Sequence, residues 1–226
     1  MQPISLQTRY RSANENTIAL WAKNAGIGNI REENYYDPVK LALAAGIKPS
    51  VPLPVLRLID ELQRLTLADP LADTLPAQGL HFTFLPLTLP LYNVNEPLPA
   101  KAAQLTTIWQ EFAAKKIVIR DLRLVALPSQ LLLAGIPDTP AIAMRQSFCD
   151  KVLDSDWKKE LLMRHGNSPL PAPFWHSTLL RYSAEFLPAV LRQFFYERQD
   201  INFGAVAGEL MLAKANYNWT KCYPLL

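Results

Sequence analysis

Short apolar runs separated by proline and glycine divide the chain into helices and strands. Behind Pro54, apolar side chains from Val55 to Leu65 recur at three- and four-residue spacing, which predicts a helix with proline in its first turn. The most apolar helical pattern of the chain covers residues 186–195. Further helices are predicted over residues 100–115, 139–152 and 156–164, and a short one near residues 17–23.

Runs rich in β-branched, leucine and aromatic residues predict the strands. They cover residues 39–45, 80–85, 174–182 and 203–213, and residues 117–127 and 131–136 form a hairpin around Pro128-Ser129. Helix, strand, helix and strand therefore follow one another twice, which is typical of an α+β fold. Residue identities do not repeat over long stretches, so the pattern by itself only suggests a duplication.

Composition narrows the class of protein. The chain has 226 residues, 50% of them hydrophobic, with a mean hydropathy of +0.02, which excludes intrinsic disorder and is enough for one packed domain or two fused lobes. No apolar run reaches the ~18 residues that a membrane span needs, and the N-terminus lacks the apolar segment of a signal peptide. We therefore expect a soluble, cytoplasmic protein with no membrane partner, in which Cys149 and Cys222 are reduced and buried.

Charge and motif searches exclude other classes. The net charge of +3 comes from 23 basic and 20 acidic residues, and these are well mixed along the chain, unlike the basic stripe of a duplex DNA-binding protein. Gly26-Ile27-Gly28 lacks the third glycine of a dinucleotide fingerprint. With three scattered histidines and no clustered cysteines, the sequence predicts neither a metal site nor a cofactor.

Two of the three histidines have a threonine two places later. The motifs are His81-Phe82-Thr83 and His176-Ser177-Thr178. Because residues i and i+2 of a strand share a face, each motif presents an imidazole beside a hydroxyl. A lone histidine on an apolar strand is ordinarily a core residue, but a matched pair in both halves favours a functional site.

The same alternation of faces predicts where the side chains next to the histidine motifs point. Phe82, Phe84 and Trp175 lie at odd offsets from the histidines and are predicted to pack in the core. Tyr182 lies six residues after His176 and lines the cleft if the strand stays straight. Arg181 lies at an odd offset, which favours a structural role.

The third histidine has a different setting. Arg164-His165-Gly166 is typical of a helix C-terminus, where cations interact favourably with the helix dipole and glycine takes a conformation with positive φ. The sequence therefore predicts a structural role for His165.

Two imidazoles and two hydroxyls suit the cleavage of a phosphodiester. One imidazole can take a proton from the attacking water or hydroxyl while the other gives a proton to the leaving oxygen. The hydroxyls can donate hydrogen bonds to the non-bridging oxygens, where negative charge gathers in the transition state. This chemistry requires no metal.

The paired motifs resemble the two-histidine phosphoesterase superfamily, which includes the LigT-like RNA 2′,3′-cyclic phosphodiesterases and 2′-5′ RNA ligases. The second motif continues as Leu179-Leu180-Arg181 and follows the pattern His-x-Thr-Leu-x-Arg. The first continues as Leu85-Pro86-Leu87, where many members have a Phe-Leu-Gly turn, and polar Ser177 stands where an apolar residue is commoner.

The resemblance implies a fold, a site and an activity. The fold would comprise two pseudo-symmetric lobes over residues 39–226, each a small antiparallel sheet backed by helices, around a central cleft, with residues 1–38 as an N-terminal extension. His81 and His176 would be the acid and base, in either order, and Thr83 and Thr178 the phosphate ligands. Arg181 matches the family pattern and would line the substrate-binding cleft. The activity would be metal-independent cleavage of a 2′,3′-cyclic phosphate or a 2′-5′ linkage in a small RNA or nucleotide.

Two alternatives use the same cleft. The chain could be a nucleotide- or RNA-binding module without turnover, which binding without product formation would reveal. It could also join RNA ends reversibly, which an assay of the reverse reaction would reveal. We expect a monomer in each case.

Overall fold

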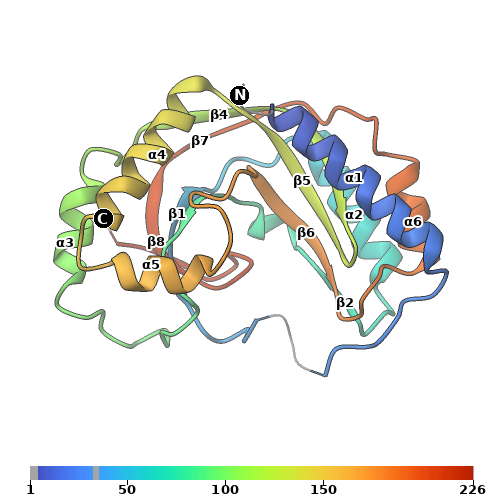
Figure 1. The fold of residues 1–226 in the computed structure, drawn as a ribbon, viewed down its shortest axis with the longest axis horizontal. Helices are drawn as coiled ribbons and strands as arrows, with labels where there is room; N and C mark the ends of the chain where they lie inside the picture. Colours follow the sequence, from blue (N-terminus) through green and yellow to red (C-terminus); the bar gives the residue numbers. More distant parts are fainter. Residues whose placement is uncertain (1–4, 33–35, 226) are drawn as a thin grey trace.

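The computed structural model describes residues 5–32 and 36–225, which form two antiparallel sheets with helices packed around them (Figure 1). This is the α+β, two-lobed architecture that the order of elements and the resemblance predicted. Within the described residues, no helix is long and apolar enough to cross a membrane.

Strands from distant parts of the chain make up each sheet. The four-stranded sheet has the order β3 (Phe82–Pro86), β1 (Ala42–Ile47), β8 (Met211–Ala215) and β9 (Cys222–Pro224). The five-stranded sheet has the order β2 (Ala72–Thr74), β6 (His176–Tyr182), β5 (Gln130–Pro137), β4 (Lys116–Leu127) and β7 (Val206–Glu209). Each histidine motif thus belongs to a different sheet.

The helices also divide between the lobes. In Figure 1, α3 (Ala102–Trp109), α4 (Thr139–Leu153) and α5 (Lys158–His165) lie on the side of the four-stranded sheet. The five-stranded sheet is flanked by α1 (Leu6–Lys23), α2 (Leu53–Thr66) and α6 (Ala189–Tyr196).

The strand expected over residues 203–213 is two strands. The chain leaves the five-stranded sheet at Glu209 and enters the four-stranded sheet at Met211. Buried Leu210 lies between them. A single apolar run therefore crosses from one lobe to the other, which periodicity cannot indicate because both halves are strands.

Three helices differ from their expected bounds. Helix α3 ends at Trp109, well before the expected end at residue 115. Helix α1 begins at Leu6, well before the expected 17–23, because Ser5 caps it and its buried side is reduced to Tyr10, Thr17 and Trp21. With so few buried side chains, the polar sequence shows no clear helical periodicity over this segment. Helix α6 begins only after Pro188, so Val190 is exposed instead of joining the predicted apolar face.

Further departures are small. The exposed Leu65 leaves the buried face of α2, and Cys222 is partly exposed whereas Cys149 is buried. The three-residue strands β2 and β9 were not predicted, because so short a segment carries no detectable alternation.

An aromatic cluster joins the two histidine strands beneath the site. Phe84, directly after Thr83, packs edge-on against Trp175, directly before His176, with ring centroids 5.8 Å apart. Trp109 and Phe148 from α3 and α4 also contact Phe84, at 6.4 and 6.2 Å. As predicted, Phe82, Phe84 and Trp175 are buried, each 1% exposed. Burial of such side chains contributes about 1.5–3 kcal/mol each, so this cluster fixes the two motifs relative to one another.

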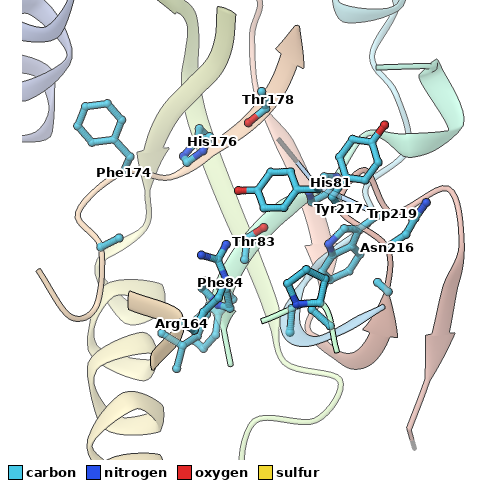
Figure 2. A pocket seen from close by; sticks show the side chains of 18 of the residues that line it. His81, Thr83, Phe84, Arg164, Phe174, His176, Thr178, Asn216, Tyr217 and Trp219 are labelled. Atoms are coloured by element: carbon cyan, nitrogen blue, oxygen red, sulfur yellow. The ribbon is translucent and has the colours of Figure 1, made fainter. Parts of the chain in front are cut away.

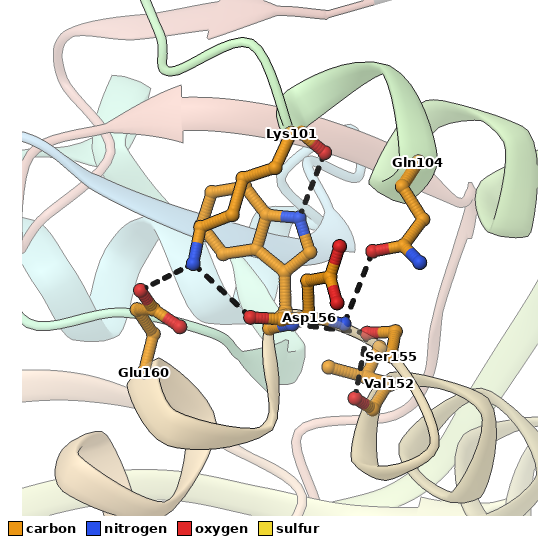
Figure 3. Close-up of polar contacts among 7 residues, drawn as sticks. Lys101, Gln104, Val152, Ser155, Asp156 and Glu160 are labelled. Atoms are coloured by element: carbon orange, nitrogen blue, oxygen red, sulfur yellow. Dashed lines mark hydrogen bonds and ion pairs between the residues drawn. The ribbon is translucent and has the colours of Figure 1, made fainter.

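Polar contacts hold α5 against the start of α3 (Figure 3). Lys101 donates to Glu160 at 2.5 Å and to the carbonyl of Asp156 at 3.1 Å. The Trp157 indole donates to the carbonyl of Lys101, and the Lys101 ammonium lies 4.7 Å from the Trp157 ring centroid. Helix α5 is thereby fixed at its N-terminus, so its last turn is held beside the cleft.

Candidate active site

The two motifs meet at one cavity of about 180 Å³ between β3 and β6. His81, Thr83, His176 and Thr178 all line it. Figure 2 shows His176 and Thr178 on one strand, facing His81, Thr83 and Tyr217 across the cavity. The prediction that both imidazoles and both hydroxyls converge on one cleft is thus met geometrically.

Each motif ends in the same irregularity of its strand. On β3, Thr83 pairs with Gly46 but Leu85 pairs with Ala45, so Phe84 is an extra residue. On β6, Thr178 pairs with Leu132 but Leu180 pairs with Leu131, so Leu179 is extra in the same way. A bulge directly after each threonine relates the two halves structurally where residue identities do not.

The bulge on β6 reverses the expected positions of two side chains. Because one extra residue exchanges the two faces of a strand, Arg181 comes to line the cavity. Tyr182 is buried in the core instead, 3% exposed, and does not line the cavity. The expectation for Tyr182 required a straight strand, and β6 is not straight.

His81 is held in one tautomer. Its Nδ1 lies 2.7 Å from the carbonyl oxygen of Gly79, and since a carbonyl only accepts, Nδ1 carries the hydrogen. The neutral ring therefore has its lone pair on Nε2. Burial lowers the pKa of His81 to about 3, against the raising effect of the Gly79 hydrogen bond and aided by the charges of Arg181, His176 and Lys48.

Trp219 covers one face of His81. The rings stack with centroids 4.9 Å apart and an interplanar angle of 6°. Trp219 has a φ of +53°, a rare conformation for so bulky a residue, which is expected where the surroundings impose it. No feature of the sequence indicated Trp219, because the β8–β9 loop brings it to His81 only in the folded chain.

His176 lies in a contrasting environment. Its ring is partly exposed to the cavity, yet Nδ1 is buried and has no hydrogen-bond partner among the described residues. Burial lowers the pKa of His176 to about 4, and the charges of Arg181 and Arg145 act in the same direction. Both imidazoles are therefore neutral at pH 7 in the unliganded protein.

Three arginines line the cavity, and none of its described lining residues is acidic. Arg145 from α4 stacks on Trp175 at 4.0 Å and donates to the carbonyl of Phe174. Arg164 comes from the last turn of α5, and Arg181 from β6. Sequence reasoning missed Arg145 and Arg164, since each is an ordinary helical cation until the fold aims it at the cleft. An anion is the ligand that these charges favour.

Helix α1 covers part of the sheet face that carries the second motif. Leu132 and Ala134 of β5 pair with Thr178 and His176 and share their face, and both belong to one apolar cluster with Tyr10. The Tyr10 hydroxyl donates to the carbonyl of Gly135 at 2.9 Å and accepts from the amide of Trp175 at 3.1 Å. The N-terminal segment thus holds the backbone next to His176.

His165 has the helix C-terminal position that the sequence predicted. It ends α5, Gly166 follows with a φ of +53°, and its Nε2 lies 3.1 Å from the carbonyl of Pro86. His165 does not line the cavity.

Comparison with solved structures identifies the fold. E. coli LigT in its apo form superposes with a TM-score of 0.52 at 15% identity, over 82% of this chain and 95% of that one. E. coli LigT complexed with ATP gives 0.52 at 14%, over 83% and 95%, and a protein described as a phosphoesterase gives 0.50 at 16%, over 82% and 96%. This chain therefore shares the fold of E. coli LigT, as the resemblance implied.

Sequence comparison adds nothing to this. No known family profile matches the chain, and no curated protein matches it.

Proposed function

We propose that this chain is a metal-independent phosphodiesterase that acts on a 2′,3′-cyclic phosphate or a 2′-5′ linkage in a small RNA or nucleotide. The observation that carries the proposal is the convergence of His81, Thr83, His176 and Thr178 on one arginine-rich cavity. The fold shared with E. coli LigT, which has been crystallised with ATP, supports a nucleotide ligand.

The tautomers favour one assignment of roles. With Nδ1–H bonded to Gly79, His81 has Nε2 available to accept a proton, so we assign it the general base. His176 would then be the general acid, and the proton that it gives up would be the one on Nε2, because Nδ1 is buried. The threonine hydroxyls would bind the non-bridging oxygens.

The proposed step is a hydrolysis at phosphorus. A water oxygen attacks phosphorus while His81 takes one of its protons, the bond from phosphorus to a ribose oxygen breaks, and protonated His176 gives its proton to that oxygen. Because His176 is neutral in the free protein, the phosphate anion must favour its protonated form on binding.

One observation favours the alternative of a binding module without turnover. With the pKa values of both histidines near 3 and 4, the unliganded cleft lacks an imidazolium donor at neutral pH. If the ligand fails to raise the pKa of His176, the cleft binds a nucleotide without cleaving it.

The test is hydrolysis of a 2′,3′-cyclic mononucleotide in the presence of EDTA. His81→Ala and His176→Ala should each lower the rate about 10²- to 10⁴-fold, with folding verified by circular dichroism and cooperative unfolding. His165→Gln is the matched control, because this histidine lies outside the cavity, and it should keep the wild-type rate.

Either folded histidine variant with wild-type activity would refute the two-histidine mechanism. Binding of the cyclic nucleotide without product in the wild type would support the module instead.

A further inference from the structure

A second cavity, of about 220 Å³, adjoins the proposed phosphate cleft. The two share Tyr36, Arg181 and Tyr217 as a common wall. The remaining lining residues of the second cavity are Pro38, Ala72, Asp73 and Ser183. A ligand whose phosphate occupies the first cavity would therefore have its next group directed along this wall.

The common wall is aromatic and well fixed. The rings of Tyr36 and Tyr217 stack with centroids 5.7 Å apart and an interplanar angle of 15°. The Arg181 guanidinium carbon lies 5.5 Å from the Tyr36 ring and 5.0 Å from the Tyr217 ring. Planar rings and a guanidinium are the groups on which a nucleobase stacks.

A carboxylate lies at the edge of the same wall. Asp73 accepts a hydrogen bond from the Tyr217 hydroxyl at 3.1 Å and pairs with Arg181 at 3.7 Å. Its side chain is still 40% exposed, so its oxygens have lone pairs to offer a ligand. A carboxylate accepts from amino groups such as N4 of cytosine, and it repels a carbonyl at the same position.

We infer that the second cavity is a nucleobase subsite, in which the base stacks on an outer face of the Tyr36–Tyr217 pair and Asp73 selects bases with an amino group. The inference rests on the proposed function, since it takes the phosphate to lie between the two histidines. It gives the N-terminal segment, through Tyr36, a direct part in substrate choice, and it defines the substrate as a nucleotide with an amino-bearing base.

Calorimetric titration of the full chain tests this with three probes: inorganic phosphate, cytidine 3′-monophosphate and uridine 3′-monophosphate. The wild type should bind the cytidine nucleotide more tightly than phosphate and more tightly than the uridine nucleotide. Tyr36→Leu should weaken cytidine nucleotide binding about 5- to 100-fold and should weaken phosphate binding much less. Tyr223→Leu is the matched control, an exposed tyrosine on β9 outside both cavities.

Asp73→Asn tests the selection of the base. It should reduce the ratio of cytidine to uridine nucleotide affinity at least 5-fold, because the amide can also donate to the uracil carbonyl. Equal weakening of both nucleotides and of phosphate would show that Asp73 only supports Arg181, and would overturn the selective role.

The outcomes separate the two proposals. If phosphate binds and His176→Asn abolishes that binding, but the cytidine nucleotide binds no more tightly than phosphate, the subsite is refuted and the proposed function stands. If Tyr36→Leu weakens phosphate and nucleotide equally, Tyr36 is only a wall and the subsite is refuted. If neither phosphate nor nucleotide binds the wild type, the proposed function itself fails.

Discussion

Neutral histidines in the cleft should lower the stability of the protein at mildly acidic pH. The pKa values of His81 and His176 are about 3 and about 4 in the folded protein, and an unfolded histidine titrates near 6.5. Between these values the unfolded chain binds more protons than the folded one, so stability rises with pH through this window and falls as the pH is lowered below 6.5.

The loss of stability at pH 5 follows from the two lowered pKa values. At pH 5 both imidazoles are neutral when folded and almost fully protonated when unfolded. Each therefore lowers the free energy of unfolding by about 2 kcal/mol relative to pH 7, or about 4 kcal/mol together. The carboxylates of Glu160 and Glu197 contribute little between pH 7 and pH 5, because their pKa values are lowered from 4.5.

Urea unfolding at pH 7 and pH 5 measures the effect. The double variant His81→Gln, His176→Gln should lose about 4 kcal/mol less between these pH values than the wild type does. His165→Gln, measured alone, accounts for the third histidine, whose pKa is also lowered by burial. An equal loss in the wild type and the double variant would mean that both imidazoles titrate normally and are well solvated, which would contradict the described cleft.

Two further predictions concern single contacts. Trp219→Leu should raise the pKa of His81 from about 3 toward 6.5, because water then reaches the ring face that the indole covers. NMR titration of the imidazole Cε1 proton measures this pKa, and an unchanged value would mean that other groups bury the ring. Tyr10→Phe should lower the free energy of unfolding by about 1–3 kcal/mol, because the Trp175 amide and the Gly135 carbonyl lose the hydroxyl that bridges them. Urea unfolding at constant pH measures this loss, and a loss near zero would mean that water replaces the hydroxyl.

Much of the local structure could be predicted from the sequence. Helix α2, the β4–β5 hairpin and helix α4 lie close to their expected bounds, because a three- to four-residue or a two-residue apolar period records which face of an element is buried. The histidine motifs followed from the same alternation, since His81 shares a face with Thr83, and His176 with Thr178, over only two residues.

Other features depend on contacts between distant segments. Helix α1 was mostly missed because its packing uses three side chains, Tyr10, Thr17 and Trp21, on an otherwise polar helix. The strand over residues 203–213 was expected as one because an apolar run shows that a segment is buried without showing which sheet it joins.

The sequence alone determined the chemistry of the site, because residue types and a two-residue period are local properties that survive any arrangement of the strands. Only the tertiary structure decided which side chains complete it. One extra residue after Thr178 moved Arg181 into the cavity and Tyr182 into the core. The stacking of Trp219 on His81 also depends on strand register and loop path, which packing between distant segments sets and no local pattern encodes.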